Sequence, residues 1–268
     1  MSWQVITRWD AAETVRPRSV KLLLALPALV ILGGAYLYPV FGSEPYTTAR
    51  FAGFVSGLLS TVAALVGILL GYNSVVGKRE SGAIRLSLSL PHSRRDVVWG
   101  TLASRAGLLC GTMAAALGVG LVLVVYPFGS LSVLRSLAFA ALTVALGAVW
   151  VNLGLAASLL VATKRRAFVL AFGLFVVLEF AWSGLLLAVE RGLSETGLVG
   201  DDPAATAAAQ AAEPGAVFQR LVDGFVDPSA SVGSAWYLDE WLALAVFIAW
   251  LIVPLGFAYY RFQGSDIA

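Results

Sequence analysis

Six stretches of this chain run for about 20 residues or more with almost no charged side chain, and this limits the possible folds most strongly. A helix of that length crosses the hydrocarbon core of a bilayer and satisfies its backbone hydrogen bonds internally. Membrane-spanning strands would alternate in polarity, whereas these runs are continuously apolar. The sequence therefore predicts an all-α polytopic membrane protein, one domain over 1–268, with six transmembrane helices at 22–41, 51–73, 101–127, 136–162, 167–189 and 241–260.

The composition excludes several other classes of protein. Apolar residues make up 59% of the chain and charged residues 13%, against about 45–50% and about 25% in soluble domains. The formal charge of +2 gives no reason to expect a nucleic-acid partner. With one cysteine, Cys110, and one histidine, His92, we expect no disulfide, metal site or cofactor in this chain. Cys110 and Met113 are expected to serve core packing.

The basic residues predict the orientation in the membrane. If the N-terminus is inside, 14 of the 18 Lys and Arg residues lie on or next to the inner side, and four lie outside: Arg50, Arg135, Arg191 and Arg220. Inner loops of membrane proteins carry such an excess. We therefore expect a multi-pass protein of the plasma (cytoplasmic) membrane with both termini cytoplasmic. The first apolar run is too long for a signal-peptide core, so we expect it to be retained.

Two further segments lie outside the spans. In residues 2–16 the apolar side chains fall on one helical face, which favours an interfacial helix over a plain basic leader. The outer loop 190–240 begins with an Ala-rich part. Asp202 and Pro203 could start a helix there, but we favour a mobile loop for 190–212. For 215–226 the spacing of the apolar residues predicts a helix that caps the bundle.

The loop 77–96 between the second and third spans is the most patterned polar segment. Ile84 and Leu88 are spaced as helix neighbours, and Pro91 would end that helix. The alternation around Ile84 would also suit a strand, but a lone strand has no partner. Ser93 and Asp96 form a capping box that would start the third span. A short amphipathic helix here could dock in a groove of another protein or lie on lipid.

This loop resembles a signature of ABC-2-type transporter permeases, E-x-G-(x)-L-L-L-S-x-P-x-S-R, which also follows the second span in that family. The matching residues here are Glu80-x-Gly82-x-Ile84-Arg85-Leu86 and Leu88-x-Leu90-Pro91-x-Ser93-Arg94-x-Asp96. The ending Arg261-Phe262-x-x-x-Asp266-Ile267 is similar to the family's usual close. Within the family, the chain looks most like permeases linked to multicopper-enzyme and nitrous-oxide-reductase maturation.

The resemblance implies a division of labour. A separate ABC ATPase subunit would bind ATP and Mg, and this chain indeed has no G-x-x-x-x-G-K-[S/T] motif. The loop would hold a coupling helix on which the ATPase docks. Two permease copies, most simply a homodimer, would form an export pathway. The docking and coupling residues would be Glu80, Gly82, Ile84, Arg85, Leu88, Pro91, Ser93 and Arg94.

Small residues predict where helices approach one another in lipid, because such contacts form at small side chains. The second span carries them at spacings of four and three residues, and the third span carries a shorter series. We expect both series to contact neighbouring backbones. The first series is Gly53, Gly57, Ser60, Ala64, Gly67 and Gly71, and the second is Gly107, Gly111, Ala114 and Gly118.

Glu179 is the one acid placed inside a predicted span, where a charge is costly. It could be a substrate or gating contact, or a polar link between helices, for example a hydrogen bond to Asn152. No paired acids, Ser/His set or H-E-x-x-H motif accompanies it in the spans, so an intramembrane enzyme is disfavoured. The remaining functions are an ATPase-driven permease and, as the alternative, an ATPase-coupled assembly or maturation factor without bulk transport.

Overall fold

The computed structural model describes residues 2–82, 93–126, 129–195, 203–231 and 233–263. Nearly all of them are helical, and this part of the chain contains no strand, only an isolated bridge between Thr47 and Ser130. The elements are α1 (Ser2–Val15), α2 (Arg18–Phe41), α3 (Thr48–Gly71), α4 (Val76–Glu80), α6 (Arg94–Val125), α7 (Val133–Leu160), α8 (Lys164–Val176), a π-helical turn η1 (Val177–Ala181), α9 (Trp182–Glu195), α10 (Pro203–Gln210), α11 (Pro214–Phe225), η2 (Trp236–Leu238) and α12 (Glu240–Gln263).

The prediction of an all-α protein with six membrane-spanning helices is confirmed. Within the described residues, six helical stretches are long and apolar enough to cross a bilayer: α2, α3 with α4, α6, α7, α8 with α9, and α12. The third begins at Arg94, seven residues before the predicted start. It starts there because Ser93 accepts a hydrogen bond from the Asp96 amide, while Asp96 accepts one from the Ser93 amide.

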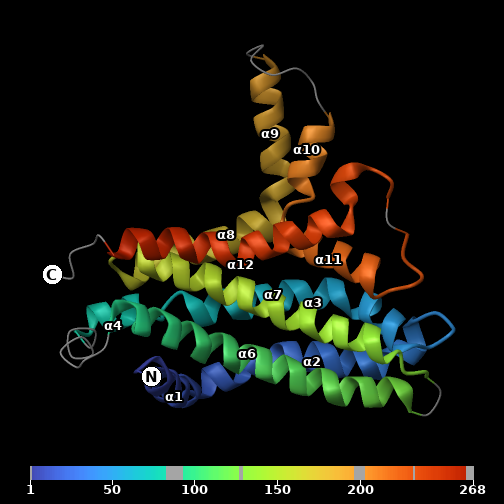
Figure 1. The fold of residues 1–268 in the computed structure, drawn as a ribbon, viewed down its shortest axis with the longest axis horizontal. Coiled ribbons are helices and arrows are strands. Elements are labelled where there is room, and N and C mark those ends of the chain that lie inside the picture. Colours follow the sequence, from blue (N-terminus) through green and yellow to red (C-terminus); the bar gives the residue numbers. More distant parts are fainter. Residues whose placement is uncertain (1, 83–92, 127–128, 196–202, 232, 264–268) are drawn as a thin grey trace.

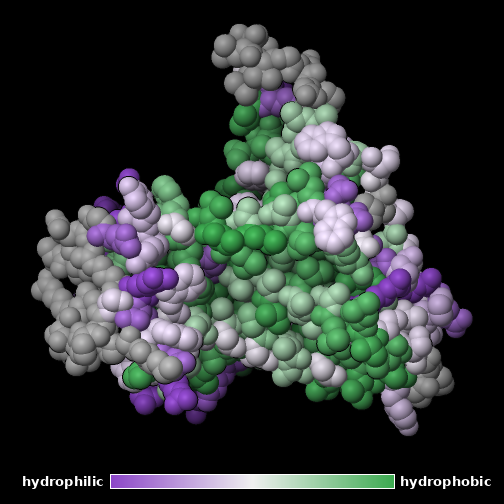
Figure 2. All heavy atoms as spheres, viewed as in Figure 1, coloured by the Kyte–Doolittle hydropathy of each residue, from purple (hydrophilic) through white to green (hydrophobic). Residues whose placement is uncertain are grey.

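The long helices lie side by side, and α1 crosses their direction at the end where α4 and the last turn of α12 also lie (Figure 1). We call this the termini end. Helices α3 and α7 form the centre, where Trp150, Phe51 and Leu59 are fully buried. Hydrophobic residues cover the middle of the bundle and hydrophilic residues gather at its two ends (Figure 2). This banding is expected of a protein whose middle contacts lipid.

The fifth span is bent, which the sequence did not predict. Helix α8 follows the bundle, but after the π-helical turn η1, α9 leaves it sideways together with α10 (Figure 1). A π-helical turn widens the helix locally and is a recognised cause of such a bend. Glu179 lies within this turn.

The outer loop differs from the expected mobile segment. Within 190–212, α9 continues to Glu195 and α10 covers Pro203–Gln210, so the mobile-loop prediction is wrong for these residues. Two indole groups hold the second part: the Trp182 Nε1–H donates to the Ala209 carbonyl and the Trp250 Nε1–H to that of Ala212. Helix α11 buries four apolar side chains against the bundle: Val217, Phe218, Leu221 and Val222.

Candidate coupling site around α4

The short helix α4 connects the second span to the loop that carries the family signature. A turn at Tyr72–Val75 separates α4 from α3. The backbone amides of Val75 and Val76 at its start both donate to the Ser158 hydroxyl of α7, at 3.0 and 2.9 Å. This side-chain cap satisfies amides that a helix start leaves free. It also fixes α4 directly to the central helix α7.

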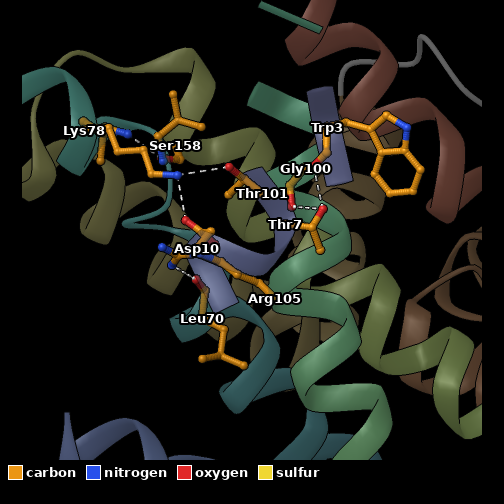
Figure 3. A network of polar contacts seen from close by, with 11 residues as sticks. Trp3, Thr7, Asp10, Leu70, Lys78, Gly100, Thr101, Arg105 and Ser158 are labelled. Atoms are coloured by element: carbon orange, nitrogen blue, oxygen red, sulfur yellow. Dashed lines mark hydrogen bonds and ion pairs between the residues drawn. The ribbon is translucent and has the colours of Figure 1, made fainter. Parts of the chain in front are cut away.

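Lys78 attaches α4 to α1 and α6 (Figure 3). Its ammonium group lies 2.6 Å from an Asp10 carboxylate oxygen and donates to the Thr101 hydroxyl at 3.3 Å. The other Asp10 oxygen accepts from Arg105 Nε at 3.3 Å, and Arg105 also donates to the Leu70 carbonyl at 2.5 Å. Asp10 is only 1% exposed. One buried carboxylate therefore joins α1 to the end of the second span and the start of the third.

The two cations decide the ionisation of Asp10. Burial by itself raises the pKa of this carboxyl group, but the charges of Arg105 and Lys78, with the hydrogen bonds of Lys78 and Ser104, outweigh it. The pKa of Asp10 therefore lies below its ordinary value. The carboxylate stays charged at neutral pH, and both cations keep their partner.

Arg79 and Glu80 attach α4 to three more helices. The Arg79 guanidinium donates to the Val161 carbonyl at the end of α7 and lies 4.7 Å from the ring centre of Phe262 in α12. The Glu80 carboxylate accepts from the backbone amide of Lys164, the first residue of α8, at 2.7 Å. An acid at a helix N-terminus is favourable for the helix dipole. Three successive charged residues thus contact α1, α6, α7, α8 and α12.

Helix α1 is held to α6 by more than the Asp10 network. The Thr7 hydroxyl donates to the Gly100 carbonyl at 3.1 Å. A Cβ on Gly100 would lie 2.8 Å from a methyl carbon of Ile6 and 2.9 Å from the Trp3 carbonyl oxygen. Only a glycine permits this approach, so α1 lies directly against the first turns of α6.

Only part of the predicted docking set can be placed. Ile84, Arg85, Leu88 and Pro91 lie outside the described residues. Gly82 has a φ of +72°, the left-handed conformation that glycine adopts readily just after a helix. Ser93 forms the capping box described above, and Arg94 is the first residue of α6. Glu80 contacts α8 of the same chain, a contact that the sequence pattern did not reveal.

The predicted pair of Glu179 and Asn152 does not form. Asn152 instead donates to the Leu251 carbonyl at 2.8 Å and to the Trp250 carbonyl at 3.4 Å, both in α12. Pro254 lies four residues after Trp250 and has no amide hydrogen, so it leaves the Trp250 carbonyl without a helical donor. Glu179 lies beside Glu213 and Thr61, close to the start of α11.

The small-residue series of the second span makes close contacts with α7 at its later positions, but not at every position. A Cβ on Gly67 or Gly71 would lie 2.5–2.7 Å from atoms of α7. Ala64 is fully buried and Ser60 nearly so. Gly53 lies against Asp227, whereas a Cβ on Gly57 would meet nothing within 4 Å. The expected close contact is therefore wrong for Gly57 within one chain.

The series of the third span faces outward. Positions Gly107, Gly111 and Gly118 have no atom within 4 Å of a Cβ placed there, and Ala114 is exposed. The prediction that this series contacts a neighbouring backbone is therefore wrong for the described residues of one chain. Met113 is fully buried, and the Cys110 thiol donates to the Val144 carbonyl. No group of three potential metal ligands occurs among the described residues.

Sequence reasoning missed Asp10, Lys78, Arg79 and Ser158, although a signal existed for some of them. Asp10 lies four residues after Ile6 and so on the same side of the helix, where an acid can be buried if cations are near. The partners Lys78 and Arg105 lie 68 and 95 residues away in the chain. A single sequence does not reveal that these distant cations pair with Asp10.

Comparison with known proteins identifies the family. The ABC-2 family transporter protein model matches residues 6–267, nearly the whole chain. The probable ABC transporter permease protein NosY of Stutzerimonas stutzeri is 27% identical over 202 residues, which are 69% of this chain and 69% of that protein. Both matches confirm the resemblance carried by the loop 80–96, and the second agrees with the suggested subgroup. The chain belongs to the ABC-2 family of transporter proteins.

Proposed function

We propose that this chain is the transmembrane subunit of an ABC exporter, driven by a separate ATPase subunit that docks on the loop 77–96 between the second and third spans. Two copies form the pathway, and the termini end faces the cytoplasm. Membership in the ABC-2 family supports the transporter role and an ABC ATPase partner. The excess of basic residues on the side of the termini supports the orientation.

The observation that carries this proposal is the set of contacts made by α4. A displacement of the docking loop first reaches Glu80, Arg79 and Lys78, and each of these contacts a different group of helices. Packed helices with such contacts move as connected bodies rather than deforming smoothly. ATP binding and hydrolysis in a docked subunit would thereby move α1, α6, α7, α8 and α12 together.

The docking part is tested by co-purification. The tagged chain is solubilised from membranes as wild type, as Arg85→Glu in the loop, and as Arg135→Glu at the opposite end of the bundle. Arg135 is exposed and serves as a matched charge-reversal control. We expect an ATP-hydrolysing subunit with wild type and the control, and its loss with Arg85→Glu. Absence of any ATPase from the wild-type preparation, or full retention by Arg85→Glu, contradicts the proposal.

A further inference from the structure

The corner between α10 and α11 (residues 209–213) is attached to the fifth and sixth spans by two indole groups. The Trp182 Nε1–H donates to the Ala209 carbonyl at 2.9 Å, and the Trp250 Nε1–H donates to the Ala212 carbonyl at 2.8 Å. Both carbonyls lie at the C-terminal end of α10, where a helix leaves its last carbonyl groups without a helical donor. One donor from each span therefore holds this corner of the outer loop in place.

Both tryptophans lie beside an interruption in their own span. Trp182 is the first residue of α9, directly after the π-helical turn η1 at which the fifth span bends (Figure 1). Trp250 lies four residues before Pro254, which cannot supply the usual backbone donor, and the Asn152 side chain of α7 donates to its carbonyl. Helices bend most readily at π-helical turns and prolines. A change of bend at either place therefore moves the indole group and with it the corner.

Polar contacts join the corner to α11, so the two move together. Arg220 of α11 donates to the Ala211 carbonyl in the corner. The Glu213 carboxylate caps α11 and accepts from the Gly215 and Ala216 amides, each at 2.6 Å. These bonds satisfy free amides at the helix start and fix its direction relative to the corner. A displacement of the corner therefore turns α11 as well.

Helix α11 covers polar side chains that belong to the spans. It lies along α3, α7 and α12 (Figure 1). The Ser56 hydroxyl of α3, on a residue that is 0% exposed, donates to the Gln219 side-chain oxygen of α11 at 2.7 Å. Glu179 of η1 lies beside Glu213 at the start of α11. Polar groups within the spans of a membrane protein mark substrate pathways, and α11 covers this set.

We propose that α10 and α11 form a hinged lid over the outer half of the transport pathway, closed in this structure and clasped by Trp182 and Trp250. Changes of bend at η1 and at Pro254 open the lid and uncover Ser56. Its role in transport rests on the proposed function above, whereas the clasp itself is a property of this chain alone.

The test measures how fast a thiol beneath the lid reacts. The full chain carries Ser56→Cys and, to remove its native cysteine, Cys110→Ser. It is studied in lipid nanodiscs, in the complex in which it purifies and without nucleotide. A water-soluble maleimide is the probe, and labelling at position 56 is followed over time by mass spectrometry. With the clasp intact, labelling should be slow because the position is buried.

Variants of the clasp should speed up this labelling. Trp182→Phe and Trp250→Phe each keep an aromatic ring but remove the N–H donor, so each should raise the labelling rate about fivefold. The double variant should raise it about 25-fold, because both bonds must break before the lid opens. Trp99→Phe, on an exposed tryptophan at the termini end, is the control and should leave the rate unchanged. Clasp variants that label at the rate of this control would show that no such lid exists.

A second arm separates the lid from the proposed driving force. In the complex with its ATPase, the labelling rate of the chain with an intact clasp should differ between ADP and a non-hydrolysable ATP analogue. Equal rates with both nucleotides, together with faster labelling of the clasp variants, would support the lid but contradict its operation by the ATPase. Clasp variants without effect would overturn the lid and leave the proposed transport function untouched, since that function does not depend on it.

Discussion

At the scale of single residues, Asp10 shows best how the fold changes the meaning of a side chain. In the sequence it is one acid in an amphipathic helix. In the structure it is buried and bonded to Lys78 and Arg105. Removing one partner of a buried ion network costs about 3–5 kcal/mol, because the remaining charges lose their compensation.

We therefore predict that Asp10→Asn lowers the free energy of unfolding by about 3 kcal/mol at pH 7, at the low end because both cations are partly exposed. Thermal unfolding of the purified protein measures this. Glu13→Gln, an exposed acid in the same helix, is the control and should change little. Equal effects of the two variants would show that the Asp10 network is not stabilising.

The same residue gives a dependence on pH. Since the pKa of Asp10 is lower in the folded state, its carboxylate stabilises the fold above the unfolded-state pKa, and this contribution is lost as the pH falls through the folded pKa. The stability difference between wild type and Asp10→Asn should be constant near neutrality and shrink below about pH 4. A difference that instead shrinks between pH 6 and 8 would assign the effect to another group.

At the scale of elements, α3 and α7 approach each other most closely at glycines. A Cβ on Gly71 would lie 2.5 Å from the Val151 carbonyl oxygen and 2.7 Å from the Gly154 Cα, and backbone atoms cannot move aside cheaply. Gly71→Ala should therefore cost about 1–3 kcal/mol of stability. Gly57→Ala in the same helix fills open space and should be neutral or slightly stabilising. Thermal unfolding distinguishes them, and identical shifts would refute the proposed contact.

Asn152 and Pro254 form a second pair that can be tested at this scale. Asn152→Ala removes the donors to the α12 carbonyls and should cost about 1–2 kcal/mol. In a Pro254→Ala background, the new amide hydrogen can bond the Trp250 carbonyl, so the same substitution should cost less. The double-mutant cycle over thermal stability measures this coupling. Purely additive effects would mean that Asn152 does not compensate for the proline.

The elements also show what a sequence can and cannot predict. The six spans were predictable because about 20 apolar residues must be hidden from water wherever they occur. The capping box at Ser93 and Asp96 is a local pattern, and it appeared as expected. The bend at η1 lies inside a uniformly apolar run, so hydropathy gives no warning of it. The start of helix α10 at Pro203 was a local pattern, but the sequence does not reveal the hydrogen bond from Trp182 that holds Ala209, and a mobile loop was favoured instead.

At the scale of the whole molecule, the charged residues that link several helices lie at the termini end. Lys78, Arg79 and Glu80 lie directly before the signature loop and reach the helices around them. Their neighbours in sequence suggested a docking loop, but their partners lie 23 to 84 residues away in the chain and are set by tertiary contacts. Family and fold class therefore followed from the sequence, whereas the connections within the site required the structure.

The central claim is that α4 transmits the nucleotide state of the ATPase to the membrane spans. Hydrogen exchange at the Lys164 amide tests this claim most directly. Because the Glu80 carboxylate accepts a hydrogen bond from this amide, Glu80→Ala should break the link between α4 and α8, and the measurement uses the fraction of the variant that keeps its ATPase. Hydrogen–deuterium exchange is measured on the complex with ADP and with a non-hydrolysable ATP analogue. In wild type, exchange at residues 76–82 and 163–168 should both depend on the nucleotide, and in Glu80→Ala only the first should. Exchange at 163–168 that is the same with both nucleotides in wild type, or that responds equally in Glu80→Ala, would contradict the claim.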